Sequence, residues 1–208
     1  MSSNPSMREQ ILQAALECMR EGGVRGATTK SIARCAGVAE GSIYNHFTNR
    51  SELIIEAFGQ ATSDIRQRAM GMAALVGRNS VEENLTDLLV DVTAFLREIT
   101  PIAGSVMGDP DLKAWFARGQ KPQSHDEDLT PLTGVVEIAE YLEAEHVGGR
   151  IAQEKPWEVC ASMLIGSCLH YVYTEALSTT GMPGLLKNND RSVRGFARSV
   201  VTSLLDVN

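Results

Sequence analysis

A short polar segment near the start of the chain carries hydrogen-bonding groups at positions that two neighbouring helices would expose. Glu40 can accept hydrogen bonds, Asn45 can donate and accept, and Lys30 can donate. Such groups read base edges in the major groove of DNA, because carboxylates accept from cytosine N4, amides pair with adenine and lysines donate to guanine. The alternative for Glu40 is a solvated carboxylate in the first turn of a helix.

Residues 28–50 supply the two helices that would hold these groups. Thr28 and Thr29 can cap the first helix, and Gly37 supplies the turn that ends it. The apolar positions expected to be buried are Ile32, Ala33, Ala36, Val38, Ile43 and Phe47. The polar positions left on the outer surface of the second helix are Glu40, Ser42, Tyr44, Asn45 and His46. The pattern predicts a helix-turn-helix with an exposed reading face.

The same residues resemble the tetracycline-repressor (TetR) family of bacterial one-component transcription regulators. The resemblance lies in Thr28-x-x-x-Ile32-Ala33-x-x-Ala36-Gly37-Val38 and Gly41-Ser42-Ile43-Tyr44-x-His46-Phe47, followed by Arg50 and Leu53. It covers roughly a quarter of the chain, and fixed spacing over such a run is more specific than a lone short motif.

The resemblance implies an all-α protein of two domains. Residues 1–50 would form a three-helix, helix-turn-helix DNA-binding domain, and residues 51–208 a larger helical domain for effector binding and dimerisation. The implied function is transcription regulation, with repression as the usual sign: a homodimer binds a pseudo-palindromic double-stranded DNA operator and is released by a small, largely apolar effector. The positions matched to phosphate contacts are Thr29, Tyr44, His46 and Arg50. The positions matched to the major groove are Lys30, Ala39, Glu40, Ser42 and Asn45.

Three positions depart from the commoner family pattern. Ala39 stands in place of Ser, Ser42 in place of Thr, and Arg50 in place of Lys. Ala39 matters most, because an alanine N-cap leaves a helical N–H without a side-chain acceptor, a loss of about 1 kcal/mol. A carboxylate at Glu40 offsets part of that loss at the positive end of the helix. We expect the operator preference of this chain to depend on Ala39 and Glu40.

Charge is distributed unevenly along the chain. Residues 1–50 carry six basic and four acidic side chains, a balance of +2, whereas the whole chain of 208 residues has a net charge of −7. A mildly basic N-terminal part followed by an acidic remainder fits a nucleic-acid-binding module attached to a domain with another role. This charge distribution excludes a generic polyanion binder.

Cysteine use and hydropathy predict a soluble intracellular protein that is not associated with a membrane, and the resemblance implies the bacterial cytosol and association with the nucleoid. The four cysteines form no Cys-x-x-Cys pair and lie in apolar helical patterns, as reduced thiols of cytosolic proteins do: Cys18, Cys35, Cys160 and Cys168. No apolar run is long enough to cross a bilayer, and the first residues lack the apolar segment of a signal peptide.

The rest of the chain reads as helices. Apolar periodicity predicts them from a capping box at Ser6 to Gly22-Gly23, from Arg50 to Gly77, and from Ser80 to Pro101, a proline that ends this helix or begins the next. Residues 119–130 are predicted to form an exposed loop. A further helix is expected from Pro131 to Gly148. The helices near 156–180 and 190–206 are so apolar that they must be covered on several sides, which predicts a homodimer interface built from both.

An effector pocket is the least specific prediction. Its candidates combine apolar bulk with a few polar tips: Met107, Trp115, Phe116, Trp157, Met163, His170, Tyr171 and Tyr173. For each residue taken singly, core packing is the better interpretation, except that an ionisable ring such as His170 in an apolar helix needs a partner or a ligand.

Other functions are weaker. Cys168, His170 and Glu175 lack the spacing that would align a nucleophile, its base and an orienting group, so we expect no enzyme, and no cofactor or metal. The acidic segment after His125 fits a solvated loop better than a metal site. Two alternatives stay open: a regulator that responds to oxidation of Cys160 or Cys168 across subunits, and a constitutive DNA-binding protein without an effector.

Overall fold

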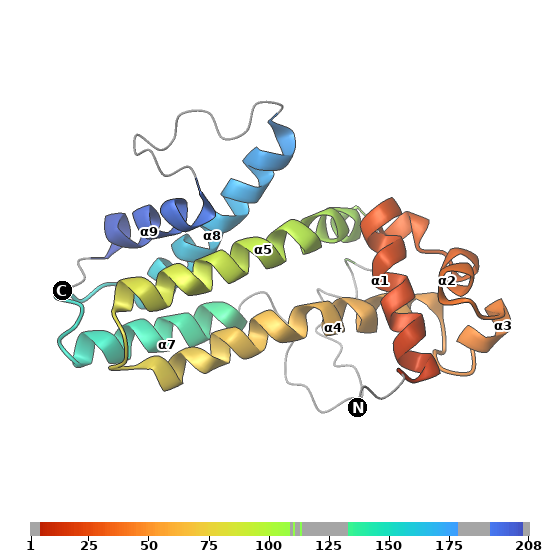
Figure 1. Ribbon diagram of the computed structural model, residues 1–208, viewed down its shortest axis with the longest axis horizontal. Helices are drawn as coiled ribbons and strands as arrows, with labels where there is room; N and C mark the ends of the chain where they lie inside the picture. The colour runs from red at the N-terminus through yellow and green to blue at the C-terminus, as the bar shows by residue number, and fades with distance from the viewer. Residues whose placement is uncertain (1–4, 109, 111–112, 114–132, 179–191, 206–208) are drawn as a thin grey trace. The chain divides into compact units, whose positions relative to one another are not determined.

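The prediction of an all-α protein is confirmed (Figure 1). The computed structural model describes residues 5–108, 110, 113, 133–178 and 192–205. In these ranges all the regular elements are helices, apart from a single β-bridge residue at Ile151. The elements are α1 (Met7–Gly26), α2 (Thr29–Ala36), α3 (Glu40–Ile43), α4 (Arg50–Met70), the 3₁₀ helix η1 (Gly71–Leu75), α5 (Val81–Met107), α7 (Thr133–Val147), α8 (Trp157–Leu177) and α9 (Val193–Leu204).

The chain divides into two compact units. The first, which we call the head, holds the described residues of Met1–Ser63 and Glu98–Leu129; the second, the body, holds those of Asp64–Arg97 and Thr130–Asn208. Helices α4 and α5 contribute residues to both. This division follows contacts, whereas the predicted boundary at residue 50 divides the chain by function and stays a prediction.

In the head, α1 braces the helix-turn-helix. Ser6 caps α1 in the predicted capping box: its Oγ accepts from Glu9 N at 3.3 Å and its own N–H donates to Glu9 Oε2 at 2.7 Å. Fully buried apolar side chains from α1, α2, α3 and α4 form the head's core: Ile11, Ala15, Met19, Ile32, Ile43 and Leu53. This core fixes α2 and α3 on α1, and leaves their other faces to solvent.

Three helix ends differ from the predictions. The backbone of α1 breaks its helical conformation at Gly23, with φ of 62°, yet the helix resumes and ends at Gly26 and not at Gly22-Gly23. Pro101 neither ends nor begins a helix: α5 continues through it to Met107, although a proline there cannot donate the usual hydrogen bond to Arg97 O. The long helix after Arg50 tightens into the 3₁₀ helix η1 at Gly71.

The body is built around one apolar core. Its buried side chains come from α5, α7, α8 and α9, and the largest contributions include Leu85, Leu89, Tyr141, Leu142 and Leu164. Helix α8 packs against both α7 and α9 (Figure 1). None of the described helices is long and apolar enough to span a bilayer.

Candidate nucleic-acid interface

The turn between α2 and α3 has the geometry that its sequence predicts. Thr28 caps α2, because its Oγ1 accepts from Ser31 N at 3.1 Å. Gly37 ends α2 in the left-handed conformation, with φ of 69°, and its N–H returns to the carbonyls of Ala33 and Arg34. A residue with a Cβ is strained at such a φ, so the glycine is what allows the sharp change of direction.

Helix α3 is short and lacks a side-chain cap. It runs for four residues from Glu40 to Ile43, and a turn continues the chain to His46. Ala39 occupies the N-cap position and accepts no hydrogen bond through its side chain. The helix is held instead by Ile43 and Phe47, whose side chains are 0% and 2% exposed. Burial of these two residues, together with the polar contacts described below, compensates for the missing cap.

The outer surface of α2 and of the turn after α3 carries polar side chains that make no hydrogen bond or ion pair within the described part of the chain. Lys30, Tyr44 and Asn45 are exposed, and His46 is half-buried. Tyr44 is the largest of them, with 55% of its surface exposed. A surface that leaves its donors and acceptors unsatisfied is suited to a polar partner.

Glu40 differs from these neighbours because it has a partner inside the head. Thr29 Oγ1 donates to Glu40 Oε1 at 2.6 Å, which joins the first residue of α2 to the first residue of α3. Ser42 is half-buried and Ala39 is exposed. The nine residues predicted to contact DNA thus come from α2, the N-cap of α3, α3 itself, the turn after it and the start of α4.

Arg50 is anchored to the backbone at the end of α1. Its Nε donates to Ala27 O at 2.8 Å and its Nη2 donates to Val24 O, and the side chain is half-buried. The guanidinium therefore braces the α1–α2 connection against the start of α4. Its predicted contact with a phosphate stays a prediction.

A second arginine braces the head from the other end of α1. Arg8 forms a bidentate ion pair with Glu56 of α4, and its guanidinium carbon lies 4.9 Å from the centre of the Phe47 ring. The Glu56 contact raises the pKa of Arg8. The Arg8 side chain thus connects α1, α4 and Phe47, which follows the turn after α3.

Sequence reasoning missed two basic side chains of this region. Arg25 and Arg34 are exposed and form no ion pair within the described residues. Arg34 lies four residues after Lys30, so both project from one face of α2. That spacing is the signal that could have added Arg34 to the predicted set.

The predicted effector residues whose side chains the structure describes lie in the body and do not share one environment. Trp157 and Tyr171 are buried, and each packs on another ring: Trp157 on His146 with centroids 5.4 Å apart, Tyr171 on Phe196 at 4.7 Å. Met163, His170 and Tyr173 lie on the exposed side of α8. The side chain of Met107 and all of Trp115 and Phe116 lie outside the described residues, as does the predicted loop over 119–130. The pocket stays a prediction.

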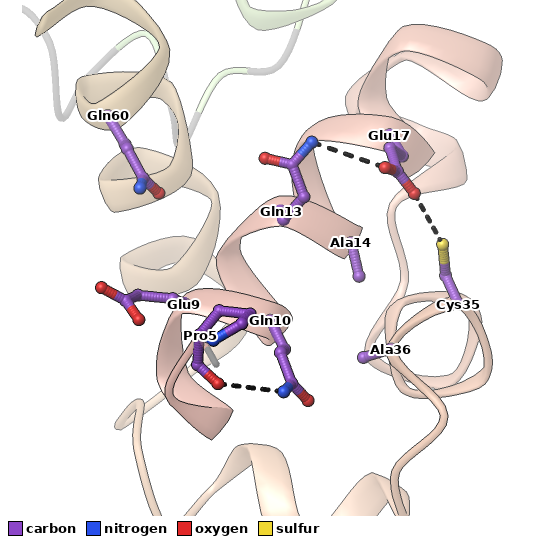
Figure 2. Close-up of a pocket in the computed structure, with 9 residues that line it drawn as sticks. All are labelled: Pro5, Glu9, Gln10, Gln13, Ala14, Glu17, Cys35, Ala36 and Gln60. Atoms are coloured by element: carbon purple, nitrogen blue, oxygen red, sulfur yellow. Dashed lines mark hydrogen bonds between the residues drawn. The ribbon is translucent and has the colours of Figure 1, made fainter. Parts of the chain in front are cut away.

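A hollow of about 610 Å³ opens in the head, on α1, α2 and α4 (Figure 2). Its lining mixes polar and apolar side chains. Among them, Glu17 accepts hydrogen bonds from Gln13 Nε2 at 3.4 Å and from Cys35 Sγ at 3.3 Å. Desolvation and then the Glu17 carboxylate raise the pKa of Cys35 to about 11. That thiol is protonated at neutral pH and therefore a poor nucleophile.

The body cysteines are enclosed. Cys160 and Cys168 are 4% and 0% exposed, and burial raises the pKa of both thiols. Cys168 Sγ also donates to Leu89 O at 3.6 Å. A redox role for either remains a prediction that nothing in their surroundings favours. No group of three or more side chains suited to a metal ion occurs among the described residues.

Comparison with known proteins finds a family match over the helix-turn-helix. Residues 11–57 match the model of "Bacterial regulatory proteins, tetR family". The chain is 30% identical over 82 residues to the HTH-type transcriptional repressor AcnR of Corynebacterium diphtheriae, a match that spans 39% of this chain and 40% of that protein. The chain therefore covers less than half of that relative's length. These similarities to regulators agree with the expectation that the protein is not an enzyme.

Solved structures extend the likeness to the fold of the whole chain. A putative TetR-family transcriptional regulator from Mesorhizobium loti superposes with a TM-score of 0.69 at 21% identity, over 95% of this chain and 94% of that one. The transcriptional regulator FadR from Bacillus subtilis, solved in complex with stearoyl-CoA, gives a TM-score of 0.61 at 20% identity, over 95% and 97%. Over residues 11–57, which include the helix-turn-helix, the chain matches the tetR family of bacterial regulatory proteins, and the solved structures share its fold over the rest of the chain.

Proposed function

We propose that the protein is a DNA-binding transcription regulator, acting as a repressor, that docks α2 and α3 against the major groove of an operator. The observation that carries the proposal is the exposed face of Lys30, Tyr44 and Asn45, whose polar groups have no partner in the described part of the chain. Tyr44, His46 and the two basic side chains on one face of α2, Lys30 and Arg34, would bind phosphates. The residues at the start of α3 would contact the bases.

Selection of bound duplexes from a random DNA library, with the full chain, tests this function. We expect one enriched pseudo-palindrome with half-sites about 34–36 Å apart, or a multiple of that, as two-fold dimers require. Tyr44→Ala should then weaken binding in a gel shift, while Val136→Ala, a truncation of an exposed side chain of α7, should leave binding unchanged. Equal affinity of the wild type and Tyr44→Ala proteins would contradict the proposed face.

The homodimer forms, in our proposal, through α8 and α9. Large apolar side chains of α8 remain exposed in the single chain: Val159 is 53%, Met163 54%, Tyr173 45% and Leu177 82% exposed. With Gly166 and His170 they follow one another at alternating steps of four and three residues, the spacing of a helix–helix seam. A stripe of this kind is unfavourable in water and favours burial against a second copy.

A charge placed in the stripe tests the dimer. In sedimentation experiments, the Met163→Glu protein should have the mass of a monomer and not that of a dimer. It should also bind the operator more weakly, because two heads would no longer bind together. Val147→Glu is the matched control, since Val147 is 81% exposed at the end of α7 and away from the stripe. A Met163→Glu protein that still sediments as a dimer would place the interface elsewhere.

A small, largely apolar effector would release the operator by stabilising a body conformation in which the heads are wrongly spaced. Support comes from the shared fold, since the FadR neighbour was solved with stearoyl-CoA. Stearoyl-CoA, free fatty acids and other apolar metabolites should be screened for an increase in melting temperature and a loss of operator affinity. If no compound changes either quantity, a constitutive regulator is the better description.

A further inference from the structure

The hydrogen bond between Thr29 and Glu40 orients a carboxylate on the reading face. Thr29 Oγ1 lies 2.6 Å from Glu40 Oε1. The cap of α2 is already supplied by Thr28, whose Oγ1 accepts from Ser31 N, so the Thr29 hydroxyl is not needed there. Thr29 is half-buried while Glu40 is exposed. Thr29 therefore holds a carboxylate that would otherwise be surrounded by solvent.

Orientation matters at this position because nothing on α3 itself restrains the Glu40 side chain. Ala39 offers no side-chain hydrogen bond, and Gly41 has no side chain. A free glutamate loses considerable rotamer entropy when it binds, about 1.5–2 kcal/mol when fully ordered. A charge-assisted bond that forms before DNA arrives removes part of that cost and directs the remaining oxygen outward.

The remaining oxygen selects among bases by its chemistry. Glu40 Oε2 has no partner within the described residues, and a carboxylate only accepts hydrogen bonds. Guanine and thymine present acceptors in the major groove and would repel it, whereas cytosine N4 and adenine N6 donate. Adenine places its N7 acceptor beside that donor, but cytosine has no acceptor on its own major-groove edge. Cytosine is therefore the better partner.

We propose that Glu40, held by Thr29, reads one cytosine in each half-site of the operator, and that Thr29 is a positioning residue for this contact. The inference rests on the proposed function, because it requires α3 to face the groove. The proton that Thr29 gives to Glu40 is not available to a phosphate, so the pair acts on sequence preference and not on general affinity for DNA.

The test compares dissociation constants of the full-length protein on the selected operator and on operators changed at each symmetric pair of positions. The wild type should favour cytosine over thymine at one pair by about tenfold or more per half-site. Glu40→Ala should abolish the preference at that pair alone. Glu40→Gln should move it from cytosine to adenine, because an amide pairs with adenine N6 and N7.

The role of Thr29 is tested through the ratio of the dissociation constants for thymine and cytosine at the position that Glu40 reads. Thr29→Val should reduce the preference at the Glu40 pair and retain the preferences elsewhere, and Thr29→Ser should restore it. Thr48→Val is the matched control: Thr48 is exposed in the same unit, its hydroxyl makes no hydrogen bond within the described residues, and the ratio should keep its wild-type value.

Two results would overturn the inference while leaving the proposed function intact. The first is a Glu40→Ala protein that selects the same motif as the wild type. The second is a Thr29→Val protein that loses the same factor on every sequence, as expected of a phosphate anchor. A wild-type protein that enriches no motif would instead overturn the proposed function, and this inference with it.

Discussion

The reading face of the head and the interior of the body use polar side chains in opposite ways. In the body, Glu145 is 1% exposed and its carboxylate is satisfied by Gly77 N and by Arg150 Nη1 at 3.0 Å. Beside it, Asn84 Nδ2 donates to Tyr141 Oη at 3.0 Å and to Arg78 O at 2.9 Å. In the head, by contrast, the largest polar groups of the reading face remain without partners in the described residues.

This contrast separates polar groups that stabilise a unit from those that serve a partner. A buried network must be complete, because each unsatisfied member costs free energy. The Glu145 network also joins the turn before α5 to the turn after α7, and burial raises the pKa of Tyr141 well above its usual value. A binding surface must be incomplete until its ligand supplies the missing partners.

The largest effect should follow from breaking the body's network. Arg150→Met leaves the Glu145 carboxylate buried without its cation, and we expect a loss of about 3 kcal/mol in the free energy of unfolding. Arg78→Met, at an exposed position near the same turn, should cost less than about 0.5 kcal/mol. Urea unfolding followed by circular dichroism measures both. Similar values for the two variants would mean that the network does not stabilise the body.

The next largest effect should come from the arginine that braces the head. Arg50→Ala removes two bonds from a charged donor to backbone carbonyls, and about 2 kcal/mol of stability should be lost. If Arg50 were only a phosphate contact, stability would not change and operator binding alone would fall. Thermal unfolding without DNA distinguishes these cases.

Arg34→Ala should show the reverse pattern. Its side chain is exposed and unpaired within the described residues, so stability should change by less than about 0.5 kcal/mol. Binding should weaken on all sequences alike, and the slope of log affinity against log salt should fall by about 1. An unchanged salt slope would remove Arg34 from the interface.

The smallest effect is expected at the surface of the body. Arg97 Nε lies 2.7 Å from Glu175 Oε2, and this bond lowers the pKa of Glu175 from its ordinary value of 4.5. Both side chains are about 40% exposed, so solvent screening limits the contribution of the pair to about 0.5 kcal/mol. Since the folded pKa is depressed, that contribution is present above pH 4.5 and is lost as the pH falls through the lowered value.

Comparison of Arg97→Gln with the wild type over pH 3 to 7 measures this contribution. The difference in stability should narrow toward the acidic end as Glu175 becomes protonated. A difference that stays constant with pH would assign the effect to the contact of Arg97 with the Tyr171 ring, at 5.8 Å.

Much of the head's structure could be predicted from the sequence, because the signals that start and end its helices are local. The capping box at Ser6, the threonine cap at Thr28 and the left-handed turn at Gly37 each depend on residues within one turn of helix. The exposed positions of Tyr44 and Asn45 follow from the burial of Ile43 and Phe47. Where such short-range rules failed, as at Gly22-Gly23 and Pro101, the helix continued through the local signal.

Side-chain partners that are distant in the sequence could not be predicted from local signals. The sequence alone determined that the protein is helical, that residues 28–50 form a helix-turn-helix and that α8 and α9 are strongly apolar. Only the tertiary structure decided that Arg50 binds the carbonyls of Val24 and Ala27, that Thr29 holds Glu40, and that Glu145 is buried with Arg150. The reason is geometric: these choices depend on which side chains meet when helices pack, and periodicity identifies a helix face without identifying its neighbour.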